Sequence, residues 1–375
     1  MQAASGATLG VGLLILSLSS ACALGRGAKA PAGPRELDHV SPQERAEYLR
    51  RAVVWRPTNV PSMDLLHGPQ GNRAFELWQK VTCDYTPWDK PLSGATPKFL
   101  CDLGGGDVVK VKYGKTNGEV YAEVAATRLL WALGFGADRM YPVEVTCRKC
   151  PIEPWYWNSE PRVDETHFEV ASIERKLEGK KIEAGKEGWD WPEIDQVDEG
   201  AGGATRAHRD GLKLLMAFLQ NSDNKRPNQE LICLPDGFKR DEAGNEECTK
   251  PFMYAQDLGL AFGKSTYLNM SRVDFNAWQG EPIWRDPRQC VANLRKTHTS
   301  SLYNPRIGEA GRKFLADLLV QLSDKQIRDM LVAGRMDRLE QETETATGKR
   351  KVTLDDWIGL FKKKRDEVVN QRCPQ

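Results

Sequence analysis

Residues 221–228 read Asn-Ser-Asp-Asn-Lys-Arg-Pro-Asn, and this stretch decides the fold that the sequence predicts. It follows an apolar run at residues 212–219 that is typical of a buried helix, and it precedes an apolar strand candidate at 230–233. A second segment, Gln-Asp-Leu-Gly at residues 256–259, follows another strand candidate at 251–255. One Asp and one Asn therefore lie on a loop after a helix. A second Asp ends a strand, before a Gly that allows the chain to turn.

The residue types in these two segments suit the transfer of a phosphoryl group. That reaction depends on positioning and on neutralising negative charge. Asp223 would accept or orient the proton of an attacking hydroxyl, and Lys225 would reach the terminal phosphate. Asp257 and Asn228 would supply oxygen ligands to Mg²⁺, which prefers carboxylate, amide and phosphate oxygen. Either segment alone is also typical of a polar turn, but the two together, each after the appropriate element, favour the functional interpretation.

A strand and a helix upstream offer a second charged contact. Residues 108–113 form a strand candidate that places Lys110 and Lys112 on one face, because side chains alternate along a strand. Residues 119–135 form a helix candidate rich in Ala and Leu, with Glu123 beside its apolar stripe. A strand lysine paired with a helix glutamate orients the nucleotide phosphates in kinases. We therefore expect one of the two lysines to pair with Glu123; the alternative is a charged edge strand and a solvent-facing glutamate.

The order of these motifs resembles that of atypical protein kinases. The segments that carry the resemblance are NGEVYAEVAA at residues 117–126, Arg-Leu-Leu at 128–130 and FLQNSD at 218–223. They are most similar to the secretory-pathway casein kinase family and its bacterial relatives, and more distantly to persister-toxin kinases and phosphoinositide kinases. The resemblance runs from about residue 93 to residue 263. The Tyr-Gly pair after Lys112 also resembles the atypical pattern, and it favours Lys112 over Lys110 as the nucleotide-binding lysine.

The chain also departs from the family pattern. Asn221 and Ser222 stand where His-Arg precedes the base in ordinary protein kinases, and Leu258 replaces Phe. The secretory family often has an acidic residue at the position of Asn228. The sequence contains no G-x-G-x-x-G motif. We expect a phosphate-binding loop near residues 93–96, and we expect the glycine run before Asp107 to be a hairpin turn.

The resemblance implies an α+β protein with the two-lobed protein-kinase fold, in which a small β-rich lobe contains one helix and the larger lobe is mainly helical. We expect the small lobe at residues 72–178, an inter-lobe insertion at 179–204 and the large lobe at 205–371. Within the large lobe, helices are expected at 309–322, 324–332 and 354–369. Before the lobes, we expect a signal peptide at 1–22, a linker at 23–40 and a helical extension at 41–71. A capping box at Ser41 opens a helix that should run to about Trp55.

The N-terminal sequence predicts export. Residues 9–18 are apolar, too few to span a bilayer but typical of a signal-peptide core. Small residues around Cys22 suit ordinary cleavage, whereas residues 18–22 resemble a lipoprotein box, and we favour lipidation at Cys22. No Lys or Arg precedes the apolar run, which weakens both interpretations. We expect no transmembrane span in the mature chain and a location in the periplasm or on a lipid anchor in a bacterium, or otherwise in the secretory pathway.

Cysteine usage agrees with export. Eight cysteines remain when Cys22 is set aside, and an even number in an exported chain predicts disulfides. Cys233 and Cys248 flank a polar loop between the two motif strands and are the first pair that we expect. Cys147 and Cys150 could form half of a zinc site, but no second C-x-x-C or His pair accompanies them, so a disulfide is favoured. The connectivity of the others is open.

Composition and charge limit the class of partner. The 375 residues carry a net charge of +1, with 40% hydrophobic and 28% charged residues. These values are ordinary for a globular protein and provide no field that would attract nucleic acid. We expect an exported phosphotransferase that uses ATP and Mg²⁺, with Mn²⁺ as an alternative metal, and that phosphorylates a hydroxyl of a protein or glycan. The alternatives are an inactive binding or scaffold protein, because ATP is scarce outside the cytoplasm and a fold does not determine function, and an enzyme that transfers AMP.

Overall fold

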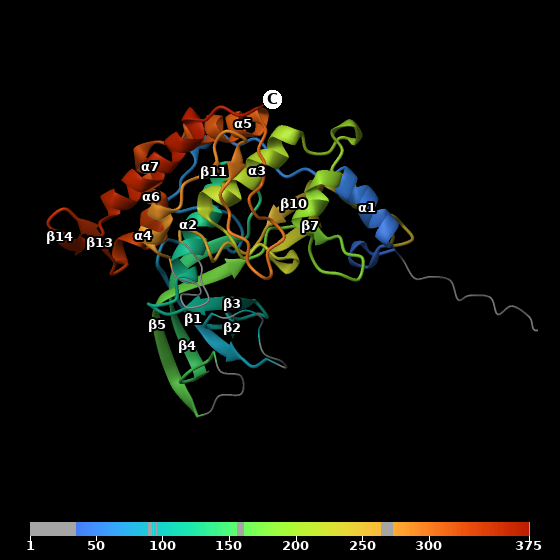
Figure 1. Cartoon of the computed structure of the whole chain (residues 1–375). Helices are drawn as coiled ribbons and strands as arrows, with labels where there is room; N and C mark the ends of the chain where they lie inside the picture. The colour runs from blue at the N-terminus through green and yellow to red at the C-terminus, as the bar shows by residue number, and fades with distance from the viewer. Residues whose placement is uncertain are drawn as a thin grey trace, which may run out of the picture.

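The computed structural model describes residues 35–88, 92, 94, 96–155, 161–263 and 273–374. Within these ranges the chain is a mixed α+β protein, which confirms the predicted class at that level (Figure 1). A group of strands projects from one side of the molecule, and the long helices of the C-terminal half gather on the other. The predicted signal peptide and the lipid anchor at Cys22 lie outside the described residues.

Five strands close into a barrel in the order β1-β2-β3-β5-β4. Neighbouring strands are antiparallel except for β1 and β4, whose parallel pairing closes the barrel. Alternate side chains fill the interior, where Phe99, Val111 and Ile173 are fully buried. The strands are β1 (Gln79–Thr86), β2 (Lys98–Asp102), β3 (Val108–Tyr113), β4 (Arg139–Pro151) and β5 (Arg162–Arg175).

The glycine run forms the predicted hairpin turn between β2 and β3. Gly104, Gly105 and Gly106 have φ values of +106°, +64° and +80°, and Asp102 pairs with Val108 on either side of them. Residues with side chains rarely adopt this backbone conformation. The run is therefore a turn rather than a phosphate-binding loop.

Helix α2 (Glu119–Ala132) packs between the barrel and the helical part of the molecule. It contacts β4 on one side and α6 on the other, and nearly all of its residues are buried, which explains why it is apolar around its whole circumference. The sequence predicts a helix to residue 135, but the structure ends it at Ala132. Trp55 donates a hydrogen bond from Nε1 to the carbonyl oxygen of Leu133 (2.7 Å), and Gly134 turns the chain with φ +85°.

The C-terminal helices are close to their predicted positions. Helix α3 packs on α5, and both α5 and α6 pack against α7. Helix α5 ends three residues before the predicted position because Ser323 already caps α6, whose capping box it forms with Gln326. The helices are α3 (Arg206–Leu219), α4 (Phe275–Gly280), α5 (Glu309–Leu319), α6 (Asp324–Ala333) and α7 (Leu354–Asn370).

Helix α1 (Pro42–Arg50) begins at the predicted capping box but is shorter than expected. The chain after it becomes extended, since Val53 forms a bridge with Phe252 and Trp55 forms one with Phe135. Val53 donates its backbone N–H to the carbonyl of Pro251 (3.0 Å) and accepts from Met253 (2.9 Å). These bonds to β10 compete with continuation of the helix.

A three-stranded antiparallel sheet carries the two motif loops. Its order is β10 (Pro251–Ala255), β7 (Gln229–Cys233) and β6 (Lys180–Lys181). Shorter elements complete the fold: the hairpins β8 (Phe238–Arg240) with β9 (Glu246–Cys248), β11 (Trp284–Asp286) with β12 (Val291–Ala292), and β13 (Glu342–Thr345) with β14 (Gly348–Lys351). The 3₁₀ helices are η1 (Leu37–His39), η2 (Val60–Ser62), η3 (Trp191–Gln196), η4 (Glu199–Ala201), η5 (Arg226–Asn228), η6 (Pro235–Gly237) and η7 (Met336–Arg338).

Two segments outside the expected lobes are packed more tightly than their polar composition indicates. In the expected insertion at 179–204, Trp189 and Trp191 are buried in the same core as α3, and Trp189 donates to the carbonyl of Glu230 (3.0 Å). At the end of the expected linker, Leu37 is fully buried and donates its N–H to Glu246 (2.9 Å). Apolar and aromatic side chains thus anchor both segments, while the lobe boundaries themselves stay predictions.

Four disulfides join the eight cysteines of the described chain. The expected pairs Cys233–Cys248 and Cys147–Cys150 are both present, and the others are Cys83–Cys101 and Cys290–Cys373. The last of these spans 83 residues and attaches the end of the chain to the segment before α5. Within the described ranges, no helix has both the length and the apolar character needed to cross a membrane.

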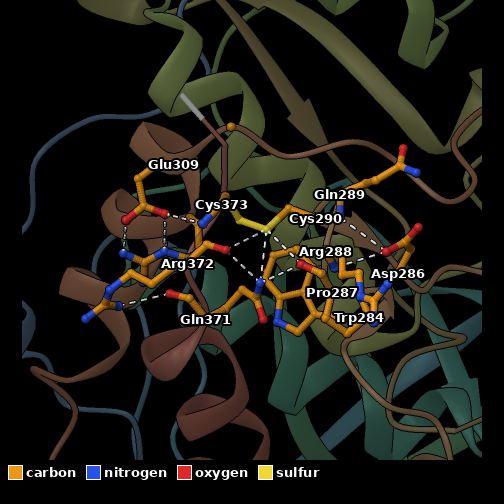
Figure 2. The surroundings of a disulfide bond; sticks show 12 residues. Trp284, Asp286, Pro287, Arg288, Gln289, Cys290, Glu309, Gln371, Arg372 and Cys373 are labelled. Atoms are coloured by element: carbon orange, nitrogen blue, oxygen red, sulfur yellow. Dashed lines mark hydrogen bonds and ion pairs between the residues drawn. A yellow bond between two sulfur atoms is a disulfide. The ribbon is translucent and has the colours of Figure 1, made fainter.

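Glu309 fastens the C-terminal end of the chain beside the Cys290–Cys373 disulfide (Figure 2). It accepts hydrogen bonds from Arg312 Nε (2.9 Å), from Arg312 Nη2 (2.6 Å) and from the backbone N–H of Cys373 (2.8 Å). The hydrogen bonds from Arg312 lower the pKa of Glu309 from 4.5 to about 2, although burial opposes this shift. Since the folded pKa lies below the unfolded one, the contact stabilises the fold above pH 4.5 and is lost as the pH falls toward 2.

The variant Glu309→Gln should therefore have a lower melting temperature than the wild type at about pH 7. The difference should shrink as the pH is lowered from 4.5 toward 2, because the wild-type carboxylate then becomes protonated too. Thermal unfolding followed by circular dichroism across this range measures it. Glu344→Gln, on the exposed strand β13, is the matched control and should change little at any pH. A difference for Glu309→Gln that is independent of pH would contradict the assignment.

Candidate functional site

Asn228 and Asp257 lie at the same end of two neighbouring strands. In the antiparallel pair β7–β10, Gln229 is opposite Ala255, so the residue before β7 comes beside the residues after β10. The carbonyl oxygen of Asn228 accepts from the backbone N–H of Gln256 (2.9 Å) and of Asp257 (3.3 Å). The two motifs, separated by a long polar loop in the sequence, therefore form one unit.

Asp223 is tied to the same unit through Asn228. The Asn228 side chain donates from Nδ2 to the carbonyl oxygen of Asp223 (2.5 Å), which leaves its amide oxygen as the end that can bind a cation. The Asp223 carboxylate accepts from Lys225 Nζ (2.9 and 3.2 Å) and from Thr299 Oγ1 (3.3 Å). Its side chain is 27% exposed, so it remains accessible to a substrate hydroxyl.

The buried side chain of Asn224 holds the loop between these residues in place. Its amide nitrogen donates to the carbonyls of Asn221 (3.1 Å) and Leu302 (3.0 Å), and its oxygen accepts the backbone N–H groups of Ser301 (3.0 Å) and Leu302 (2.8 Å). All four bonds lie within the protein, because Asn224 is fully buried. The sequence motif treats this position as variable, so sequence reasoning missed its role.

Arg226 anchors the other end of the loop to the segment that the sequence predicts as an insertion. It pairs with Asp190 (2.9 Å) and Glu193 (2.6 Å), and it donates to the carbonyl of Gly188 (2.9 Å). Gly188 itself approaches the loop so closely that an added Cβ would lie 2.2 Å from the carbonyl oxygen of Arg226. Residues 188–193 are therefore a support for the loop.

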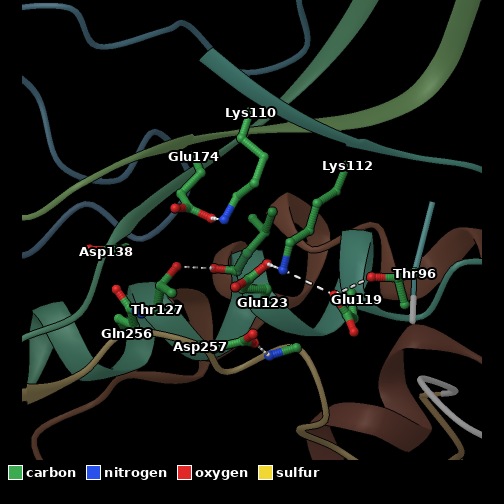
Figure 3. A network of polar contacts seen from close by, with 12 residues as sticks. Thr96, Lys110, Lys112, Glu119, Glu123, Thr127, Asp138, Glu174, Gln256 and Asp257 are labelled. Carbon is green, nitrogen blue, oxygen red and sulfur yellow. Dashed lines mark hydrogen bonds and ion pairs between the residues drawn. The ribbon is translucent and has the colours of Figure 1, made fainter. Parts of the chain in front are cut away.

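The expected ion pair between strand and helix is present, and Lys112 rather than Lys110 forms it (Figure 3). Lys112 Nζ lies 2.7 Å from Glu123 Oε2, and the side chains of both residues are 2% exposed. A second carboxylate, that of Glu119, lies 3.0 Å from the same ammonium and accepts a hydrogen bond from Thr96 (2.7 Å). Sequence reasoning did not assign Glu119 a role, although its spacing of four residues from Glu123 places both on one face of a helix.

Lys110 belongs to a neighbouring set of charges. It pairs with Glu174 on β5 (2.5 Å), and Glu174 also pairs with Lys176 (2.9 Å). The ammonium group of Lys176 also pairs with the buried Asp138 (2.8 Å) and donates a hydrogen bond to Gln256 (2.7 Å), the residue before Asp257. A chain of polar contacts thus joins the outer face of the barrel to the second motif loop.

The electrostatics keep a cation and an anion at the centre of the site. Burial would lower the pKa of Lys112, but Glu119 and Glu123 hold it well above its usual range. Burial would raise the pKa of Asp257, but the charge of Lys112, the hydrogen bond from Gly259 N–H and the charge of Lys110 together lower it. Burial acts to raise the pKa of Glu123, and the charge of Lys112 opposes this shift. Lys112 is therefore charged and Asp257 ionised near neutral pH.

The loops and the barrel meet where Gly259 contacts α2. An added Cβ at Gly259 would lie 2.6 Å from Cγ of Glu119, so the turn after Asp257 requires a residue without a side chain. The structure thereby brings Lys112 and Glu123 into the neighbourhood of Asp257. The backbone N–H of Asp257 is hydrogen-bonded to Asn228, whose side chain in turn is hydrogen-bonded to the backbone of Asp223. Of the expected phosphate-binding loop at 93–96, Ser93 and Ala95 lie outside the described residues.

The oxygen atoms at this position fit a hard divalent cation. Asp257 offers an ionised carboxylate. Asn228 offers its amide oxygen, because its amide nitrogen already donates to the carbonyl oxygen of Asp223. Carboxylate and amide oxygens are ligands that Mg²⁺ and Mn²⁺ accept. The cationic side chain next to them, Lys112, suits the phosphates that such a metal accompanies.

Comparison with known proteins gives no family for the chain. No protein-family model and no curated protein matches the sequence. One solved structure that matches is the proinflammatory kinase CtkA of Helicobacter pylori, with a TM-score of 0.39 and 10% sequence identity; the match covers 78% of this chain and 97% of that chain. The structure itself supports the class of a mixed α+β protein.

Replacing Lys112 by Met should destabilise the free protein by about 3–5 kcal/mol, because two buried carboxylates lose their cation. The double variant Lys112→Met, Glu123→Gln should recover part of the loss, since one buried acid is removed with the cation. Urea unfolding of the nucleotide-free protein measures both.

The matched control for this prediction is Lys110→Met. Its partner Glu174 retains Lys176 at 2.9 Å, so the loss should be clearly smaller. Equal losses for the two lysine variants would show that the Lys112 ion pair is not a special element of the fold.

Replacing Asn224 by Ala should cost roughly 2–4 kcal/mol, because buried carbonyl and N–H groups are left without partners. Asn224→Asp should also destabilise the protein, since Asp can accept from Ser301 and Leu302 but cannot donate to the two carbonyls. Hydrogen exchange of the amides of Ser301 and Leu302 checks the mechanism. These amides should exchange faster in the Ala variant than in the Asp variant, and equal rates would contradict it.

Proposed function

We propose that the protein is an atypical kinase that transfers the terminal phosphoryl group of ATP to a hydroxyl of a protein or glycan, with Mg²⁺ or Mn²⁺ as the metal. The observation that carries the proposal is the buried Lys112–Glu123 ion pair beside the ionised Asp257. Charges are costly to bury, and this arrangement leaves a cation and a metal-binding carboxylate next to each other. Phosphoryl transfer requires that combination.

Each predicted residue has a role that its surroundings support. Lys112, held by Glu123, would bind the nucleotide phosphates, and Lys110 would contribute positive charge from the same strand. Asp257 and Asn228 would hold the metal ion. Asp223 would orient the attacking hydroxyl and accept its proton, and Lys225, which pairs with Asp223 in this structure, would neutralise charge on the transferred group.

The same proposal includes a two-lobed organisation. The barrel and α2, within residues 72–178, would form the small lobe, and residues 205–371 would form the large lobe. Residues 179–204 would lie between them and support the catalytic loop through Arg226. The nucleotide-binding lysine and the base would then reside on different lobes.

We also propose that the protein is exported. Four disulfides within the described chain are compatible with an oxidising compartment. The signal peptide at 1–22, with lipidation at Cys22, is the expected route, and the periplasm or the secretory pathway is the expected destination. The acceptor would then be a protein or glycan that passes through the same compartment.

One observation favours a second candidate, a kinase-fold scaffold without turnover. Lys112 is engaged by two carboxylates, Glu119 and Glu123, where one is sufficient to orient it. A lysine held in this way competes less well for phosphate. The test below separates the two functions.

Asp257→Ala should abolish phosphoryl transfer, because it removes the carboxylate that holds the metal. Asp223→Ala should slow turnover by about 10²–10⁴-fold while largely retaining ATP binding, because a base does not hold the nucleotide. Transfer from labelled ATP to candidate proteins and glycans, together with ATP binding by calorimetry, measures both effects.

Asp317→Ala, on the exposed surface of α5, is the control and should behave as the wild type. A scaffold would show the same negligible turnover in all forms. Equal, measurable turnover in the wild type and Asp223→Ala would show that residues 221–228 are not the catalytic loop.

A further inference from the structure

Lys98, a residue to which the sequence analysis assigned no role, lies directly beside Lys112. In the antiparallel pair β2–β3, Lys98 is opposite Lys112, and Leu100 is opposite Lys110. Side chains at directly opposite positions point to the same face of a sheet, with Cβ atoms about 4.5–5.5 Å apart. Lys98 thus shares the outer face of the barrel with Lys112, whereas the next residue of β2, Phe99, points into the barrel core.

Two buried ammonium groups lie side by side in this arrangement, and the charge of Glu119 acts on both of them. Lys98 is 6% exposed and Lys112 is 2% exposed. Like charges at directly opposite positions destabilise a sheet. Burial, and then the charge of Lys112, lower the pKa of Lys98. A second buried ammonium group beside Lys112 would strengthen the attraction of this site for an anion.

The surroundings of this pair point to the same conclusion. Ser172 on β5 is opposite Lys112 on the other side, so Lys98, Lys112 and Ser172 form one row across three strands. The Ser172 hydroxyl is fully buried and has no hydrogen-bond partner among the described residues. Buried polar atoms are nearly always hydrogen-bonded in native proteins. An oxyanion over this row would accept bonds from two ammonium groups and one hydroxyl.

The loop expected to cover the phosphates reaches Lys98. Gly94 has φ +97°, and an added Cβ on it would lie 2.6 Å from Lys98 Nζ. Thr96 of the same loop donates to Glu119, the second acid on Lys112. The Lys98 ammonium also lies 5.6 Å from the centre of the Trp155 ring, a contact that positions its long side chain. The cation is thus held under the loop and beside the nucleotide-binding lysine.

We propose that Lys98 is a second phosphate-binding lysine, which acts with Lys112 and selects a nucleotide triphosphate over nucleotides with fewer phosphates. This inference rests on the proposed kinase function and extends it to specificity. Lys112 is constrained by Glu119 and Glu123 on α2, whereas Lys98 approaches from the adjacent strand under the loop. A chain of three phosphates can contact both lysines, and nucleotides with fewer phosphates lose one of the two contacts.

The test compares Lys98→Met with the wild type by calorimetric titration with ATP, ADP and adenosine in the presence of Mg²⁺. The variant should bind ATP roughly 10- to 100-fold more weakly, which corresponds to the loss of one charge-assisted hydrogen bond. ADP binding should weaken less, and adenosine binding should not change. Lys80→Met, an exposed lysine on β1 of the same barrel, is the matched control and should bind all three as the wild type does.

Thermal unfolding of the free proteins separates binding from a structural role. Lys98→Met removes a buried charge and keeps an apolar chain of similar length, so the variant should remain folded and its melting temperature reports any structural role of Lys98. A lower melting temperature with unchanged preference for ATP would assign Lys98 to the support of Trp155 and overturn the proposal. If this variant does not fold, Lys98→Gln removes the charge with a polar side chain and serves the same comparison.

The outcomes distinguish this inference from the function on which it rests. If the wild type binds ATP and the Lys98 variants lose affinity equally for all three ligands, or for none, Lys98 does not select the triphosphate and the kinase proposal stands. If the wild type binds none of the three, the kinase proposal fails and the role of Lys98 fails with it. A loss that grows from adenosine to ADP to ATP supports both.

Discussion

The ammonium group of Lys112 is the charge around which the rest of the structure is arranged. A buried cation is strongly destabilising unless it is paired and hydrogen-bonded, and Lys112 lies within 3.0 Å of two carboxylates. Both carboxylates come from the first turns of α2, so the pairing fixes the position of this helix on the barrel. Because α2 also packs against α6, the same pairing orients the barrel relative to the helical part of the molecule.

A second constraint acts on the loops. Asn228 connects Asp223 and Asp257 through its side-chain nitrogen and its carbonyl oxygen, and Asn224 ties the loop to residues 301 and 302. Each of these bonds is made by an Asn side chain or by a backbone group of the loop. Hydrogen bonds of short polar side chains are stronger when the side chains are buried away from water than when they are exposed to it. The loop is therefore held in place by its contacts with two distant segments, at residue 257 and at residues 301–302, rather than by its own composition.

The segment 179–204 shows how a polar stretch can become structural. Its composition is that of a loop, yet two tryptophans bury it and Arg226 bridges to its carboxylates. Burial of an aromatic side chain removes a large apolar area from water. The free energy from this burial offsets the conformational entropy that is lost when the surrounding glycines and charged residues are ordered. The loop at residues 221–228 thus has a support that its own sequence does not reveal.

The sequence by itself determined the elements whose signals are local. The capping box of α1, the glycine turn between β2 and β3, the long helices and the strands at 230–233 and 251–255 all follow from periodicity, turn residues and caps. It also indicated that Lys110 and Lys112 share a face, that Cys233 pairs with Cys248, and that Glu123 lies within reach of the strand. These features depend on the alternation of a single element or on residues at most 15 positions apart in the sequence.

Tertiary structure decided everything that depends on the register between elements. Lys98 lies beside Lys112 only because β2 and β3 pair in one particular alignment, and a shift by one residue would turn it into the barrel core. Asn224 binds residue 302 through contacts that leave no periodic trace in the sequence. The spacing of Glu119 from Glu123 places both on one helix face, but only the packing of that helix on the barrel brings Glu119 to Lys112. The sequence favoured Lys112 over Lys110 only through a resemblance, and the tertiary structure supplies the physical reason, since β5 presents Glu174 to Lys110 and α2 presents Glu123 to Lys112. Burial and charge at each position are properties of the assembled fold, because they depend on which distant segments exclude water from the site.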